Sequence, residues 1–179
     1  SSFNNRAIWS DKSNREEKKN NWLFYRPLSY FDFPKNFGSI TAIDSIQDNA
    51  VLVRYENKAQ LYNVLTTIDT STGNAYLGND KLFSSVPPLD LAHTQSGHSG
   101  SQHQMLVYTP YGMVYVDSLR GQVLLFSGKN PIPISGKGMS KWFQENLKFK
   151  NKDITDNAFI FNGITGEYDS FHNRLLITK

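Results

Sequence analysis

Three of the four histidines, His93, His98 and His103, stand at five-residue intervals in a segment of Gly, Ser and Gln. Imidazole nitrogens are common zinc ligands, so the run raises the question of a metal site. The spacing matches neither one face of a helix nor one face of a strand, and no acidic residue lies between Asp90 and Asp117. A Gly- and Ser-rich segment also offers nothing to hold the rings together. The pattern favours a surface loop, and we predict no metal and no cofactor.

Four acidic residues lie in or beside predicted turns: Asp117, Asp153, Asp156 and Asp169. Two facing carboxylates would allow glycoside hydrolysis, which makes a hydrolase one alternative. An Asp in a tight turn more simply accepts hydrogen bonds from backbone N–H groups. The chain contains no complete phosphate loop and no nucleophile elbow in a strand–turn–helix context. We therefore do not predict an enzyme.

The composition excludes several classes of protein. The chain has 179 residues and no cysteine, so disulfides and zinc–thiolate sites are excluded. Lys and Arg number 19 against 16 Asp and Glu, and the basic residues are spread along the chain, so no dedicated nucleic-acid surface is indicated. No run of about 18 apolar residues is present, so no membrane segment is predicted. Aromatic residues make up 13% of the chain, which favours sheets.

Apolar residues alternate with polar ones in three stretches, roughly 40–64, 104–135 and 158–179, and turn-forming residues interrupt each stretch. This pattern predicts three antiparallel meanders. We expect a mainly β fold in which these meanders are part of a β-propeller-like domain, with the layers of a solenoid or a sandwich as the alternatives. Residues 1–179 are expected to form a single β-rich segment.

One segment, 138–147, has a helical pattern. Met139, Trp142, Phe143 and Leu147 follow the spacing i, i+3, i+4, i+8 and predict one apolar face. We expect this short amphipathic helix to pack on the sheet after the second meander.

The two ends of the sequence both resemble interior parts of a chain. The sequence begins with Ser1 rather than with an initiating Met. The last residues, 174–179, have a strand-like pattern with no polar tail. We expect the sequence to be a piece of a longer polypeptide.

An ordered series of segments carries a resemblance to a known family. The segments are Thr70 to Gly78, Leu82 to Ser84, Gly97 to His103, Tyr111 to Asp117 with Arg120 to Val123, Ile134 to Leu147 and Tyr168 to Lys179. In their amino-acid sequences and in their order along the chain, these segments resemble a central part of the large tail proteins of short-tailed crAss-like bacteriophages. Those proteins are described as muzzle, tail-nozzle or stabilisation proteins. The resemblance runs from about Ala7 to the last residue. His103 lies within these segments, and His93 does not.

The resemblance implies a structural virion protein of the phage tail. Such proteins form a ring at the distal end of the tail, contain propeller-like domains and close the DNA channel before genome ejection. The implied partners are other copies of the chain, other tail and portal-ring proteins and, transiently, the phage DNA. No catalytic residues are implied. A carbohydrate- or receptor-binding β-propeller module is the alternative function.

Residues 21–34 are dense in aromatic side chains beside two prolines. For a ring-forming protein we predict that Trp22, Phe24, Phe31 and Phe33 include contacts with other subunits or neighbouring domains. The alternative is that these rings fill the space between sheets of the same chain. Their solvent exposure distinguishes the two cases.

Overall fold

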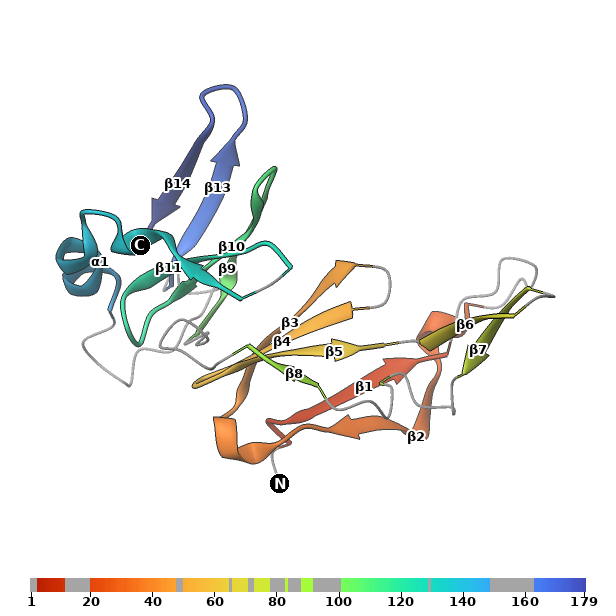
Figure 1. The fold of residues 1–179 in the computed structure, drawn as a ribbon. Coiled ribbons are helices and arrows are strands. Elements are labelled where there is room, and N and C mark those ends of the chain that lie inside the picture. Colours follow the sequence, from red (N-terminus) through yellow and green to blue (C-terminus); the bar gives the residue numbers. More distant parts are fainter. Residues whose placement is uncertain are drawn as a thin grey trace.

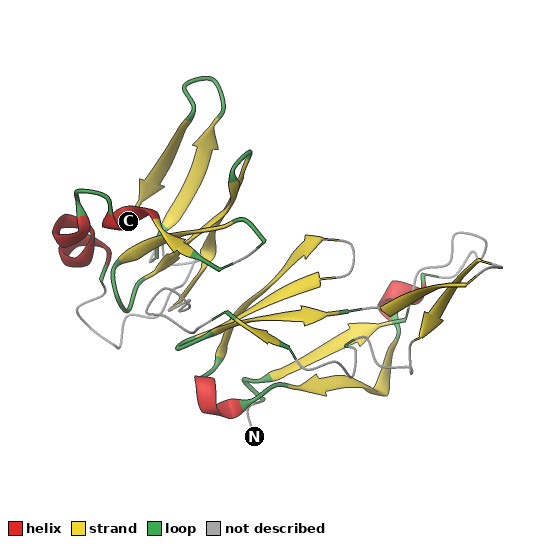
Figure 2. Cartoon of the chain, in the orientation of Figure 1, coloured by secondary structure: helices red, strands yellow, loops and turns green. Residues whose placement is uncertain are grey.

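The computed structural model describes residues 3–11, 20–47, 50–64, 66–70, 73–77, 83, 88–91, 101–128, 130–148 and 163–179. For residues 47, 66–70, 73–77, 90 and 101–104 only the backbone is described. Antiparallel strands dominate these residues, and they contain one α-helix (Figures 1 and 2). The prediction of a mainly β fold with one helix is confirmed.

The strands in the described ranges form five antiparallel sheets. A hairpin of β1 (Arg6–Ser10) and β2 (Tyr25–Asp32) comes first. It is followed by a four-stranded sheet of β3 (Ile40–Gln47), β4 (Ala50–Tyr55), β5 (Ala59–Asn63) and β8 (Leu89–Asp90). A second four-stranded sheet contains β9 (Ser101–Thr109), β10 (Gly112–Asp117), β11 (Gln122–Phe126) and β12 (Ile132–Pro133). The remaining hairpins are β6 (Thr66–Thr70) with β7 (Gly73–Leu77), and β13 (Thr165–Asp169) with β14 (Arg174–Thr178).

The helical elements are short and connect these sheets. The described residues contain three 3₁₀ turns: η1 (Asn21–Leu23), η2 (Lys35–Phe37) and η3 (Ile134–Gly136). The α-helix, α1 (Ser140–Leu147), follows the second four-stranded sheet, as predicted. It begins two residues later than the predicted 138, because Gly138 has a φ of 95°, which a right-handed helix does not contain.

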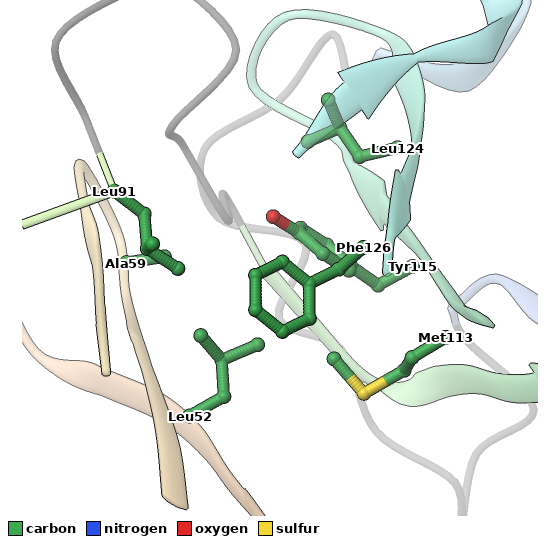
Figure 3. Close-up of a cluster of buried hydrophobic side chains, with 7 residues drawn as sticks. All are labelled: Leu52, Ala59, Leu91, Met113, Tyr115, Leu124 and Phe126. Carbon is green, nitrogen blue, oxygen red and sulfur yellow. The ribbon is translucent and has the colours of Figure 1, made fainter. Parts of the chain in front are cut away.

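Three apolar cores lie between successive layers of this structure. The aromatic core joins the β1–β2 hairpin to the first four-stranded sheet and contains Phe33, Val53, Tyr55, Tyr62 and Phe83. The junction core joins the two four-stranded sheets and contains Leu52, Ala59, Leu91, Met113, Tyr115, Leu124 and Phe126 (Figure 3). The C-terminal core joins the second sheet to α1 and the β13–β14 hairpin and contains Met105, Val107, Val114, Val116, Val123, Leu147 and Ile164.

The second four-stranded sheet is therefore apolar on both faces. Along β10, Met113 and Tyr115 point into the junction core, whereas Val114 and Val116 point into the C-terminal core. Successive side chains of a strand point to opposite faces, so a strand covered on both sides has an almost continuous apolar sequence. The same holds for β4, where Leu52 lies in the junction core and Val53 in the aromatic core.

The three predicted meanders correspond to observed strands to different degrees. The stretch 40–64 forms β3, β4 and β5, and the stretch 104–135 falls within β9 to η3. Of the stretch 158–179, the β13–β14 hairpin is observed, and residues 158–162 lie outside the described residues.

The predicted apolar face of the helix is only half buried. Leu147 and Phe143 pack in the C-terminal core, but Met139 and Trp142 remain 52% and 51% exposed. The prediction that all four residues pack on the sheet is wrong for these two. Within the described residues, α1 contacts β11 and η3, and the turn before β11 also lies against it. Gly121 in this turn comes so close that a Cβ atom there would lie 2.6 Å from Gln144 Cα.

Candidate interaction surface

The four aromatic residues predicted as contacts separate into two environments. Trp22 and Phe24 are 58% and 59% exposed. Phe33 is 3% exposed, and Phe31 packs beside it with a ring-centroid distance of 4.8 Å. Phe31 and Phe33 therefore fill the space between two layers of this chain, as the alternative interpretation had it. Trp22 and Phe24 have the exposure that a contact with another chain requires, and that role stays a prediction.

Trp22 and Phe24 belong to a larger exposed surface, which we call the aromatic turn. It consists of Trp22, Leu23, Phe24, Tyr25 and Leu28, which are all more than half exposed. The density of aromatic residues in 21–34 identified two of its five members, Trp22 and Phe24. In η1, a 3₁₀ turn, side chains do not alternate between two faces as they do in a strand, and Trp22 and Leu23 are both exposed.

Backbone and side-chain hydrogen bonds hold the aromatic turn in place. The N–H groups of Leu23 and Phe24 donate to Asn20 O and Asn21 O, both at 3.0 Å. Asp11 N donates to Phe24 O at 2.9 Å. Arg26 donates to both carboxylate oxygens of Asp11, at 2.7 and 3.0 Å. The rings are thus displayed on an ordered backbone, which lowers the conformational entropy that a binding event would cost.

A second ion pair lies on the outer face of the same hairpin. Arg6 donates to both oxygens of Asp32, at 2.6 and 2.7 Å. This contact lowers the pKa of the Asp32 carboxyl and raises the pKa of the Arg6 guanidinium. The guanidinium also lies over the rings of Tyr30 and Phe3, 4.0 and 4.4 Å from their centroids. Charged groups on this face are therefore paired with each other, and the apolar side chains beside them are not covered by the described residues.

The turn between β13 and β14 forms a second exposed cluster. Phe171 at its apex is 89% exposed. Asp169 Oδ1 accepts hydrogen bonds from the backbone N–H groups of Phe171 and His172, at 3.1 and 3.2 Å. Its Oδ2 accepts from Arg174 Nε at 2.9 Å and lies 2.8 Å from His172 Nδ1. These hydrogen bonds, with the largest from the His172 side chain, lower the pKa of the Asp169 carboxyl.

A neighbouring hairpin supports this apex. Asn173, whose φ is 50°, donates through Nδ2 to Tyr111 Oη at 3.1 Å. The hydroxyl of Tyr168 donates to Asn173 Oδ1. Tyr111, in the β9–β10 turn, is 62% exposed. The two turns together present Phe171, Tyr111 and the outer parts of His172 and Arg174 to solvent.

The acidic residues in the turns have structural partners. Asp117 is fully buried, and its Oδ1 accepts from Leu119 N and Arg120 N at 2.9 and 3.1 Å. Asp169 holds its own turn in the same way. This confirms the turn interpretation for both residues. Asp153 and Asp156 lie outside the described residues.

The histidine run is mostly outside the described part of the chain. His93 and His98 belong to residues 92–100, and His103 lies in β9 with only its backbone described. Among the residues that the structure describes, no group of three His, Cys, Asp or Glu side chains could hold a metal ion. The prediction of no metal site stays a prediction for the run itself.

One polar cluster lies in the interior. Arg54 on β4 is fully buried, and its Nε donates to Asp44 Oδ2 at 2.8 Å. Its guanidinium carbon lies 5.2 Å from the centroid of the Tyr115 ring on β10. Burial raises the pKa of the Tyr115 phenol, so this group stays neutral. The sequence Val-Leu-Val-Arg-Tyr gave only one signal of this cluster, an arginine inside an apolar run.

Comparisons with protein-family models and with curated proteins identify no relative of this chain. No protein-family model matches this chain, and no curated protein matches it significantly. Among the helices of the described residues, none has the length and apolar character to cross a membrane.

Proposed function

We propose that this chain is a structural segment of a phage tail protein of the muzzle or nozzle type, in which it contributes to a distal tail ring that closes the DNA channel. The role is non-catalytic, and the site of action is the virion tail. The partners are other copies of the chain and the adjoining tail and portal-ring proteins, with phage DNA passing transiently.

The arrangement of the sheets supports a propeller-like domain within that larger protein. Two consecutive four-stranded meanders, β3–β4–β5–β8 and β9–β10–β11–β12, are packed face to face through the junction core. Neighbouring blades of a propeller are four-stranded antiparallel sheets that pack in this way around an axis. The β1–β2 and β13–β14 hairpins cover the two outer faces of the pair.

The observation that carries the proposal is the aromatic turn. Five apolar or aromatic side chains within residues 22–28 are exposed on an ordered backbone, beside charged groups that are already paired with each other. Large exposed apolar patches on soluble proteins mark interaction sites. Tryptophan and tyrosine are enriched among the residues that dominate interface energies. An assembly surface accounts for this exposure better than a catalytic cleft does.

The test is electron microscopy of the full-length parent protein, with and without Trp22→Ser and Phe24→Ser. We expect rings for the unaltered protein and loss or marked weakening of ring formation for the double variant. Trp142→Ser is the matched control, because Trp142 is exposed to a similar degree but lies on α1. Absence of rings from the unaltered protein, or equal ring formation by all three proteins, would contradict the proposal.

The cluster at the β13–β14 apex favours a second candidate, a carbohydrate- or receptor-binding module. Exposed Phe171 and Tyr111 offer ring faces on which a sugar can stack, and Arg174 and His172 offer hydrogen-bond donors beside them. A glycan array distinguishes this candidate from the first. Saturable binding to one sugar family, abolished by Phe171→Ala, supports it, and an array without signal contradicts it.

A further inference from the structure

The contact between the two four-stranded sheets combines apolar packing with an incompletely paired charge. Leu52, Ala59 and Leu91 of the first sheet face Met113, Leu124 and Phe126 of the second (Figure 3). Arg54, fully buried, lies in the same contact and reaches the ring of Tyr115, which is also fully buried. The charge and the apolar side chains therefore share one interface.

Three polar atoms in this contact have no hydrogen-bond partner among the residues that the structure describes. They are Nη1 and Nη2 of Arg54 and the hydroxyl oxygen of Tyr115, all buried. Within the same residues the guanidinium is paired through Nε, with Asp44. A buried donor without an acceptor loses its hydration without compensation, and the loss is larger for a charged group. The cation–π contact with Tyr115 offsets only part of this loss.

The ion pair does not hold the two sheets together. Asp44 lies on β3 and Arg54 on β4, which are neighbouring strands of the same sheet. The pair therefore stays intact when the second sheet moves away. The one hydrogen bond between side chain and backbone that crosses from the second sheet to the first in the described residues joins Tyr108 Oη to Ser45 O, at 3.0 Å and exposed to solvent. Exposed hydrogen bonds of this kind exchange readily with water.

We infer that the junction between the two four-stranded sheets is a two-state joint, which can open without unfolding either sheet. In the closed state apolar packing favours contact, and the dehydrated Arg54 guanidinium and Tyr115 hydroxyl oppose it. A small separation lets water reach all three unpaired atoms while the Arg54–Asp44 pair persists. The opposing contributions bring the two states close in free energy, which is the requirement for a switchable element. This inference does not depend on the phage-tail proposal.

The test measures the separation of the sheets directly in the full chain. Because the sequence contains no cysteine, Asn63→Cys and Leu119→Cys provide unique attachment sites for two spin labels, one on each side of the junction. Both positions are exposed. Pulsed electron resonance then reports the distribution of label distances. We expect two populations in the otherwise unaltered chain, a short closed distance and a longer open one.

Variants of the polar cluster should change these populations in opposite directions. Asp44→Asn removes the anion that is paired with Arg54 and should increase the open fraction. Asp44→Asn with Arg54→Met removes the charge altogether, and replacing both members of a buried pair is often stabilising. The double variant should therefore decrease the open fraction, by about tenfold relative to Asp44→Asn alone. Tyr115→Phe, which removes only the unpaired hydroxyl, should also decrease it and carries little risk of misfolding.

The controls distinguish a buried charge that favours opening of the junction from an Arg54 that simply holds the junction closed. If Arg54 simply held the junction closed, the double variant and Asp44→Asn would both increase the open fraction. The exposed pair Arg26 and Asp11, changed to Met and Asn, applies the same change of charge away from the junction and should leave the distances unaltered. A single sharp distance in the unaltered chain, or a wider distribution in Tyr115→Phe, would overturn the inference.

Discussion

Gly166 on β13 lies close against β9, where the C-terminal hairpin contacts the second four-stranded sheet. A Cβ atom at this position would lie 2.5 Å from Met105 Sδ, 2.7 Å from Met105 Cε and 2.9 Å from the backbone oxygen of Leu176. Met105 is fully buried, so its side chain cannot move without displacing other parts of the C-terminal core. Gly166→Ala therefore forces two packed layers apart.

The expected loss of stability follows from two opposing contributions. Adding a methyl group to a well-packed core costs about 1–3 kcal/mol. Replacing glycine by alanine also restricts the unfolded chain, which stabilises the folded state by about 0.4–1 kcal/mol. The net prediction is a decrease of about 1–2 kcal/mol in the free energy of unfolding. For a protein of this size each 1 kcal/mol corresponds to a decrease of about 2–4 °C in Tm.

Urea denaturation followed by tryptophan fluorescence measures this change. Gly136→Ala is the matched control, because no atom lies within 4 Å of a Cβ at Gly136. It should leave the stability unchanged or raise it slightly. Combining Gly166→Ala with Met105→Leu should recover part of the loss, since the two sites are in contact. Equal stability of Gly166→Ala and the unaltered chain would refute the packing argument.

Three further outcomes are expected. Phe33→Ala should lower the free energy of unfolding by about 3–5 kcal/mol, because this ring is 3% exposed and packs against Tyr62 and Phe83. Phe24→Ala, at an exposed site, should change the free energy of unfolding by less than about 0.5 kcal/mol. Urea denaturation measures both changes. Asp169 has a lowered pKa in the folded state, so it stabilises the fold above the ordinary carboxyl pKa of about 4, and this contribution is lost as the pH falls through the folded-state pKa. Asp169→Asn should therefore flatten the dependence of Tm on pH in the acid range, and an unchanged slope would contradict the role given to this carboxylate.

The strands were predictable because their side chains follow the pleat. Alternation and turn residues located β3 to β5 and β9 to β11 from the sequence alone. The order of layers was not predictable, because a strand such as β10, with Met113 and Val114 pointing to opposite cores, shows an apolar run that does not identify its neighbours. The extent of α1 was misjudged by two residues at Gly138, whose backbone conformation depends on the surrounding chain.

The sequence indicated which aromatic residues are candidates for a contact surface, but not which of them are exposed to solvent. Aromatic density drew attention to residues 21–34, yet Phe33 and Trp22 have equal apolar character and opposite exposure. What separates them is η1, which breaks the alternation before β2 begins. Phe171 escaped sequence reasoning because a single phenylalanine in a turn carries no periodic signal. The environment of Arg54 was not predicted, because a strand pattern does not show that a buried guanidinium is paired at Nε while its two Nη atoms lack partners among the described residues.

The sheets with two apolar faces also determine how this chain can be divided. Removal of the β13–β14 hairpin by proteolysis would leave Met105, Val114 and Val116 facing water. The larger fragment would then expose apolar core residues to water, and we expect it to aggregate rather than remain as a smaller soluble unit. Trimming from the other flank would bare the rings of Tyr55 and Tyr62 in the same way. Each terminal hairpin thus covers the outer apolar face of the four-stranded sheet beside it and keeps that face out of water.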